Sequence, residues 1–166
     1  FRRVLFRSAG DSAITESIFD AGNVPGIGIL QNSSGGLRLT NNKFLNGTYH
    51  YLGEFDAPSN TSILVISGNS SEWASACNIA LNSRNMTTFG LVVIEGNQLS
   101  LAPGASGILL QDPGYEFLNT VTIGDNVLNQ SARSIGLNLV RGKAITVNTN
   151  TFAGDRKSTR LNSSHT

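Results

Sequence analysis

One pattern recurs five times along this chain, and it limits the possible folds more than any other feature of the sequence. An apolar residue stands at position i, a second at i+2 and an Asn at i+5, usually with another apolar residue at i+7. The copies start at Leu37, Leu64, Val92, Val121 and Ile145, which are 27, 28, 29 and 24 residues apart. A repeat of roughly 20–50 residues is typical of solenoids and related arrays, so we expect a chain of stacked units.

The other positions of the pattern are equally regular. The second apolar positions are Leu39, Ile66, Ile94, Ile123 and Val147, and the amide positions are Asn42, Asn69, Asn97, Asn126 and Asn150. The last position holds Phe44, Leu99, Leu128 and Phe152, and only Ser71 departs from the apolar type. A second apolar-x-apolar segment lies at Ile27/Ile29, Ile79/Leu81, Ile108/Leu110 and Leu137/Leu139, and a step of 29 residues back from Ile79 adds His50/Leu52. We therefore expect two short strands in each unit, separated by turn-forming Gly, Asn, Ser and Asp.

The period-two alternation excludes helical solenoids, whose units repeat apolar residues about every 3.6 positions. Such short strands cannot stand alone, but coils stacked about 4.8 Å apart pair each strand with its counterparts above and below. The inward apolar residues then form columns, and the Asn side chains at the turns can hydrogen-bond along the stack. The sequence predicts an all-β fold, a parallel β-helix of about five coils with an internal Asn ladder.

The phrases LTNNKF, VIEGNQL and ITVNTNTF, one per coil, resemble the right-handed parallel β-helix of the pectin-lyase-like superfamily over about residues 18–153. The resemblance implies a right-handed coil and a secreted or surface protein that handles polysaccharide, since family members include lyases, hydrolases, epimerases, tailspikes and adhesins. It is specific for the fold and unspecific for the function. A β-sandwich also has many short strands, but it does not predict an Asn at one fixed offset in five units.

The two ends differ from the rest of the chain. Residues 1–8 read FRRVLFRS and residues 155–165 read DRKSTRLNSSH. Both strings resemble translations of one short-read sequencing adapter, the first forward and the second as its reverse complement. We therefore expect the solenoid fragment within residues 9–154, with residues 1–8 and 155–166 as adapter-like segments that contribute no core.

Removing these ends changes the charge balance. Six of the twelve basic residues lie in them, and residues 9–154 keep six basic and ten acidic residues, a net charge of −4. A basic surface for nucleic acid is therefore not expected. No apolar run is long enough for a membrane span, and the single Cys77 cannot form an internal disulfide. Cys77 is expected to be an inert, small apolar residue.

The first candidate site is a charged edge. Arg84, Asp112 and Arg141 follow the first strand of successive coils, and Lys143 is close behind. In the predicted register they share one edge of the helix at steps of about 5 Å. Two cations beside a carboxylate are suited to binding a uronate carboxyl group. The alternative is an alternating-charge ladder on a solvated edge, which contributes little.

The second candidate site is aromatic. Tyr49 and Tyr51 lie in a segment with nearby acids, and Trp73 falls in the following coil. Sugar rings stack on flat side chains while acids and amides bind their hydroxyls, so an exposed cluster would bind saccharide. The alternative is that these aromatics cover the outside of a strand, with His50 pointing inward.

Motifs for catalysis are missing from the sequence. It has neither the Gly-His-Gly of the related hydrolases nor the Arg-x-Pro-x-x-Arg of the calcium-dependent lyases, and residues 112–116, DPGYE, lack the His of the epimerase motif. Neither a cofactor nor a metal site is expected, because no phosphate-binding loop or Cys/His spacing is present.

Two classes of function remain. The chain is either part of a secreted or surface protein that binds or processes acidic polysaccharide or a cell-surface glycan, or part of a non-catalytic adhesin, tailspike shaft or similar structural module. The residues leave open whether it is an enzyme and what its oligomeric state is.

Overall fold

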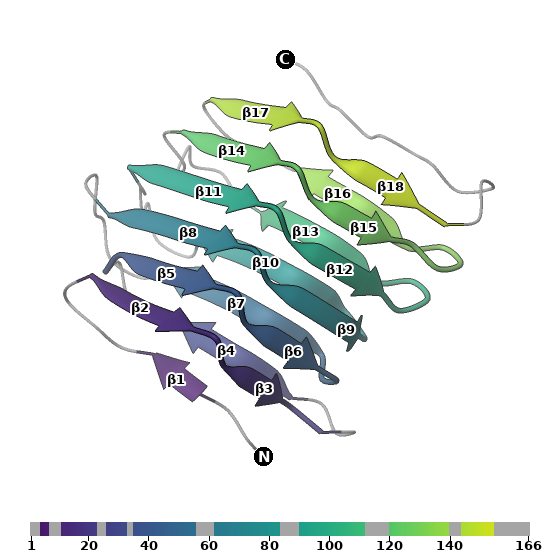
Figure 1. The fold of residues 1–166 in the computed structure, drawn as a ribbon, viewed down its shortest axis with the longest axis horizontal. Coiled ribbons are helices and arrows are strands. Elements are labelled where there is room, and N and C mark those ends of the chain that lie inside the picture. The colour runs from purple at the N-terminus through teal and green to yellow at the C-terminus, as the bar shows by residue number, and fades with distance from the viewer. Residues whose placement is uncertain are drawn as a thin grey trace.

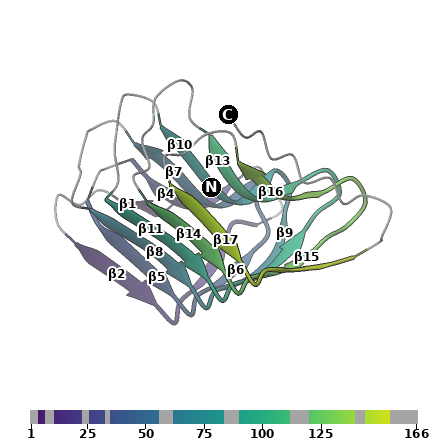
Figure 2. The same ribbon diagram turned by 90° about the horizontal axis from the view of Figure 1, so that it is seen from above.

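The computed structural model describes residues 4–6, 11–22, 26–32, 35–55, 62–83, 90–111, 120–139 and 144–154. Within these ranges the chain forms strands and no helix, and the strands make three parallel sheets of six strands each. Figure 1 shows two of the sheets side by side along the stack and the third behind them. Figure 2, turned by 90°, shows that they form the sides of a continuous coil. The predicted parallel β-solenoid is confirmed.

The three sheets are named here A, B and C. Sheet A contains β1 (Val4–Phe6), β4 (Ile27–Gln31), β7 (Tyr49–Phe55), β10 (Cys77–Ser83), β13 (Ser106–Gln111) and β16 (Ile135–Leu139). Sheet B contains β2 (Ser12–Thr15), β5 (Leu37–Thr40), β8 (Ile63–Ser67), β11 (Leu91–Glu95), β14 (Val121–Gly124) and β17 (Ile145–Asn148). Sheet C contains β3 (Ile18–Asp20), β6 (Lys43–Leu45), β9 (Ser70–Ala74), β12 (Gln98–Leu101), β15 (Val127–Asn129) and β18 (Thr151–Ala153).

Each coil has three strands, one in each sheet, and not the two that the sequence predicted. The additional strand of each coil belongs to sheet C and begins just after the ladder Asn. A single left-handed residue precedes that Asn in five successive coils, at Asn41, Gly68, Gly96, Asp125 and Thr149. This one residue turns the chain between sheets B and C, so the apolar residue at i+7 belongs to a strand of its own. The strands of sheet C were not predicted because each of them contributes few inward residues.

The predicted columns of sheet B are confirmed by the strand register. Leu37 pairs with Leu64, Leu64 with Val92, Val92 with Val121 and Val121 with Ile145, and the second column pairs in the same way from Leu39 to Val147. The inward residues of the central strands are fully buried, whereas Val147 in the last strand of the sheet is 43% exposed. Burial of these aliphatic columns is the main apolar contribution to stability.

The Asn ladder is also confirmed. Each side-chain amide donates to the Oδ1 of the next Asn, from Asn42 to Asn69 at 3.1 Å, Asn69 to Asn97 at 3.0 Å, Asn97 to Asn126 at 2.9 Å and Asn126 to Asn150 at 2.8 Å. The same Oδ1 atoms accept the backbone N–H of the preceding ladder residue. The ladder therefore satisfies polar groups that a buried turn would otherwise leave unpaired.

In sheet A the predicted register is wrong by one residue in β7. Ile79 pairs with Tyr51, and Tyr51 with Ile29, so the inward column runs Ile29, Tyr51, Ile79, Ile108, Leu137. The pair His50/Leu52 does not occupy it. The reason is that the step from Tyr51 to Ile79 is 28 residues and the step from Ile29 to Tyr51 only 22, so the spacing of 29 does not extend back to β7.

The N-terminal segment carries one strand. Val4–Phe6 forms β1, which pairs in parallel with Ile29–Gln31 of β4. This backbone pairing falls within residues 1–8, which we expected to lie outside the solenoid. Residues 155–166 lie outside the described residues. No helix in the described part of the chain is long and apolar enough to cross a membrane.

Candidate functional site

The charged edge predicted from the sequence, Arg84, Asp112, Arg141 and Lys143, lies outside the described residues. The strands that lead to it are described, and they pair in the predicted register, Ile79 with Ile108 and Ile108 with Leu137. The candidate site therefore stays a prediction about the edge that follows β10, β13 and β16.

The three aromatic candidates do not form one platform. Tyr51 is 1% exposed and lies in the main core, where its hydroxyl donates a 2.7 Å hydrogen bond to Oε1 of Gln31. Tyr49 is half-buried on the outer side of sheet A, where it packs against a small cluster that includes Leu52 and Cys77. Trp73 is 59% exposed in sheet C. Tyr51 is thus excluded from saccharide stacking by burial, and Trp73 is the one of the three with a largely exposed ring.

Trp73 lies in a β-bulge of β9. Leu99 of β12 pairs with Ser71 and Leu101 pairs with Ala74, so two residues of β9, Glu72 and Trp73, stand opposite one residue of β12. Both of these residues are exposed, while Ser71 and Ala74 on either side are buried. A bulge re-aims side chains in this way, and bulges are enriched next to functional sites.

The backbone at Trp73 is strained. Its φ is +58°, the left-handed region that bulky side chains avoid. Left-handed conformation costs a non-glycine residue about 1–2 kcal/mol. Glycine is the residue expected at such a position, and an exposed tryptophan that keeps this conformation is an outlier of the type found at binding sites.

Polar groups surround the bulge. Lys43 of β6 forms a 3.0 Å ion pair with Glu72, and both side chains are about half exposed. The backbone N–H of Asn46 donates to the carbonyl of Glu72, and the Asn46 side chain donates to Oδ1 of Asp20 at 3.0 Å. An exposed indole with carboxylate, ammonium and amide groups on the neighbouring strands can stack on a sugar ring and hydrogen-bond to its hydroxyls.

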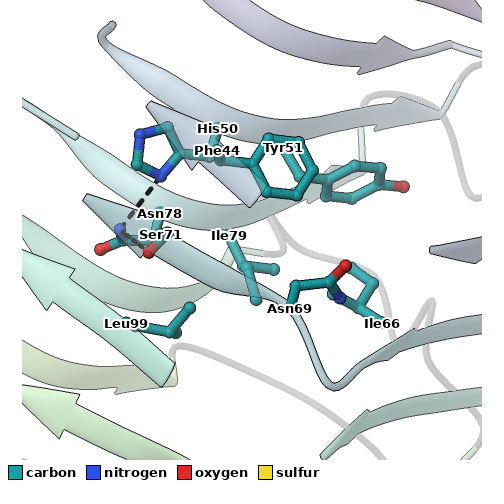
Figure 3. Close-up of a pocket in the computed structure, with 9 residues that line it drawn as sticks. All are labelled: Phe44, His50, Tyr51, Ile66, Asn69, Ser71, Asn78, Ile79 and Leu99. Atoms are coloured by element: carbon teal, nitrogen blue, oxygen red, sulfur yellow. Dashed lines mark hydrogen bonds between the residues drawn. The ribbon is translucent and has the colours of Figure 1, made fainter. Parts of the chain in front are cut away.

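A second polar cluster lies inside the solenoid (Figure 3). The side-chain amide of Asn78 donates to Oγ of Ser71 at 2.7 Å and lies 3.2 Å from Nδ1 of His50. The His50 ring stacks on Phe44, with centroids 5.8 Å apart. Since an amide N–H faces Nδ1, the neutral ring carries its proton on Nε2, which makes no hydrogen bond and is buried.

This cluster explains why Ser71 breaks the repeat. The register places His50 level with Gly28, and Asn78 level with Gly107, in the same row of sheet A. A Cβ at Gly28 would lie 3.2 Å from the Phe44 ring, and a Cβ at Gly107 would lie 2.6 Å from a methyl group of Leu128. Where this row of sheet A has a glycine, a large side chain of sheet C, Phe44 or Leu128, fills the space beside it. In the coil with His50 the imidazole ring occupies that space, so sheet C carries the small Ser71.

Burial controls the chemistry of the interior groups. It lowers the pKa of His50 to about 4, although the carbonyls of Asn46 and Glu72 oppose the shift. Burial also raises the pKa of Tyr51 well above its ordinary value, and raises the pKa of the Cys77 thiol to about 12. His50 is therefore neutral and Cys77 is a thiol at pH 7, and burial separates both groups from a ligand at the surface.

The space beside the cluster is too small for a substrate. Figure 3 shows the void between the rings of Phe44 and Tyr51 and the side chains of Ile79 and Leu99. Its volume is about 10 Å³, room for about one water molecule. Among the described residues no group of three His, Cys, Asp or Glu is placed to hold a metal ion. The exposed bulge is therefore the stronger candidate site.

Neither feature was fully predictable. Ser71 is the one position where the apolar pattern of the repeat fails, and this departure was the only indication of the interior cluster in the sequence. Asn78 carried no sign at all. The conformation of Trp73 has no sequence signal, since glycine would be expected there.

No family model, curated protein or solved structure matches the chain. Its function is therefore inferred from the geometry.

Proposed function

We propose that this β-solenoid binds polysaccharide through the outer surface of sheet C, centred on Trp73. The observation that carries the proposal is the exposed, left-handed tryptophan of the bulge in β9. An exposed indole provides a large apolar surface that the fold itself does not need buried, and the strain is tolerated where a ligand uses the ring.

The proposal includes the relationship that the sequence suggested. The solenoid is a right-handed member of the pectin-lyase-like superfamily, and it works outside the cytoplasm on a cell-surface or secreted glycan. The parallel three-sheet coil and the Asn ladder support this assignment, and the general right-handedness of parallel crossovers supports the hand. Binding is the proposed activity, and no catalytic step is part of it.

Trp73 makes the test direct, because it is the only tryptophan of the chain. Its fluorescence is followed while oligogalacturonate, oligoalginate and cello-oligosaccharides are added, and at least one of them should change the emission. Calorimetric titration of Trp73→Ala with the same sugar should then show a loss of about tenfold or more in affinity, the effect of removing one stacking or anchoring contact.

A matched control separates the ring from general surface effects. Ile135 is 42% exposed and belongs to sheet A. Ile135→Ala should bind as the unmodified protein does. If none of the sugars binds, or if Trp73→Ala binds unchanged, the proposal is wrong and a structural or adhesive role is the better reading.

The edge formed by Arg84, Asp112, Arg141 and Lys143 is a separate prediction for acidic polymers. Arg84→Ala and Arg141→Ala should weaken oligogalacturonate binding by about 1–3 kcal/mol each if the guanidinium groups hold carboxylates. Equal binding by both variants would leave the edge as a solvated charge ladder.

A further inference from the structure

The outer surface of sheet C has two columns of side chains that continue past Trp73 along the stack. The first column is Lys43, Ser70, Gln98 and Val127. The second is interrupted at the bulge, where Glu72 and Trp73 stand opposite Ser100, and it consists of Leu45 and Glu72 on one side and Ser100 and Asn129 on the other. These strands, β6, β9, β12 and β15, lie in consecutive positions on the face of the solenoid turned toward the viewer in Figure 1. Successive members are about 4.8 Å apart, the spacing between neighbouring strands.

Two amides on this surface are available to a ligand. Gln98 is exposed and Asn129 is half-buried, and neither side chain forms a hydrogen bond with any described residue. Gln98 lies one coil beyond the bulge and Asn129 two coils beyond it. Each amide offers a donor and an acceptor, the pair of groups that sugar hydroxyls use.

Acidic residues outnumber basic ones near this surface, because Glu95 and Asp125 are exposed on the turns that lead into β12 and β15. Asp20 and Glu72 are acidic, Lys43 is basic and paired with Glu72, and Arg133 lies on the turn that follows β15. The rest of the two columns is uncharged. A surface with more acidic than basic groups repels a polyanion, so a neutral ligand fits it better than a uronate polymer.

We propose that sheet C binds a neutral, extended β-1,4-linked polysaccharide parallel to the solenoid axis, with about one sugar residue over each coil from β6 to β15. This inference rests on the proposed function and names its substrate class. One hexose of an extended chain is about as long as the spacing between coils, about 4.8 Å, so the polymer and the columns keep the same register. Trp73 stacks on one ring, and Gln98 and Asn129 bind the hydroxyls of the next two.

The experiment uses cello-oligosaccharides of two to six units and oligogalacturonates of the same lengths, titrated calorimetrically into the full chain. Affinity for the cello-oligosaccharides should rise by about tenfold or more between two and four units and then level off, because four strands form the surface. Oligogalacturonates of equal length should bind more weakly to this surface, which is measured with Arg84→Ala/Arg141→Ala to remove the separate charged edge.

One variant and its matched control test whether the sugar chain lies in register with the coils. Asn129→Ala should weaken binding of the four-unit sugar by about 3- to 10-fold, the effect of one hydrogen bond, and leave the two-unit sugar unchanged. Thr122→Ala is the matched control, because Thr122 lies in the same coil as Asn129 but on the outer side of sheet B. It should bind both sugars as the unmodified protein does.

The possible failures are distinguishable. Binding that requires Trp73 but does not depend on sugar length or on Asn129 overturns the axial arrangement and leaves the proposed function standing. Tighter binding of oligogalacturonate through Trp73 overturns the neutral substrate class alone. If no sugar binds in a way that depends on Trp73, the proposed function is wrong and this inference is wrong with it.

Discussion

Lowering the pH is expected to destabilise this fold through His50. The ring is 2% exposed, and burial lowers its pKa from 6.5 to about 4. In the unfolded chain the same ring is in water and becomes protonated below about pH 6.5. Between pH 6.5 and 4 the unfolded state therefore binds more protons, so stability decreases as the pH falls through this window and levels off below it.

The size of the effect follows from the two pKa values. At about 1.4 kcal/mol per pH unit, the full difference amounts to about 3 kcal/mol. Of this, about 2 kcal/mol is lost already between pH 7 and pH 5. For a chain of 166 residues, a change of that size lowers the midpoint of thermal unfolding by about 4–8 °C.

Urea unfolding at pH 7 and pH 5 measures this contribution when the full chain is compared with His50→Gln, which cannot be protonated. The unmodified chain should lose about 2 kcal/mol more than the variant over the same pH interval. The comparison of pH dependence removes any constant effect of the substitution itself. Parallel losses in the two proteins would refute the argument.

A second measurement serves if His50→Gln does not fold. The ring resonances of His50 are followed by NMR in the unmodified folded protein while the pH is lowered. Titration near pH 6.5 would show that the ring is not desolvated, and the stability argument would fail. A ring that stays neutral until the protein unfolds agrees with it.

Three further outcomes are expected, each measured by urea unfolding. Asn97→Ala should cost about 4 kcal/mol, because the buried amide takes part in four hydrogen bonds. Asn150→Ala removes four hydrogen bonds as well but at a half-buried position, so it should cost less, and equal costs would contradict the role given to burial. Trp73→Gly should be more stable than Trp73→Ala by about 1 kcal/mol, the reverse of the usual order in a strand, because glycine adopts the left-handed backbone without strain. Ser71→Leu should destabilise by about 1–3 kcal/mol through overpacking, and adding His50→Gly should recover at least about 1 kcal/mol of it, whereas additive effects would show that the two positions do not share one space.

The sequence predicted the parts of this fold that depend on alternation. Leu64, Ile66 and Asn69 lie at fixed offsets in their coil, and columns and a ladder follow from such offsets by geometry alone. The strands of sheet C were not predicted, because a strand with one inward residue such as Phe44 shows no alternation. The register of β7 failed because coil lengths vary, and one residue of error exchanges the two faces of a strand.

The candidate site was predicted in composition but not in arrangement. Tyr49, Tyr51 and Trp73 are close in sequence, yet the coil separates them onto the outer side of sheet A, the interior and sheet C. The left-handed backbone of Trp73 is imposed by the bulge, and tertiary pairing of this kind has no local signal. Sequence reasoning therefore found the ring and missed the geometry that exposes it.

Both departures from the regular repeat lie in the same strand, β9. Its inward Ser71 leaves apolar volume unfilled and contacts a polar cluster, and its outward Trp73 holds a strained backbone. A coil that only needed to stack would be expected to carry a large apolar residue and Gly at these positions, as the neighbouring coils do for the first with Phe44 and Leu99. A solenoid tolerates such a strand because the coils on both sides, through β6 and β12, keep their own columns and their own ladder contacts. Of the two residues only Trp73 faces outward, and its strained, exposed ring, rather than the repeat itself, is the physical reason to place the binding surface on sheet C.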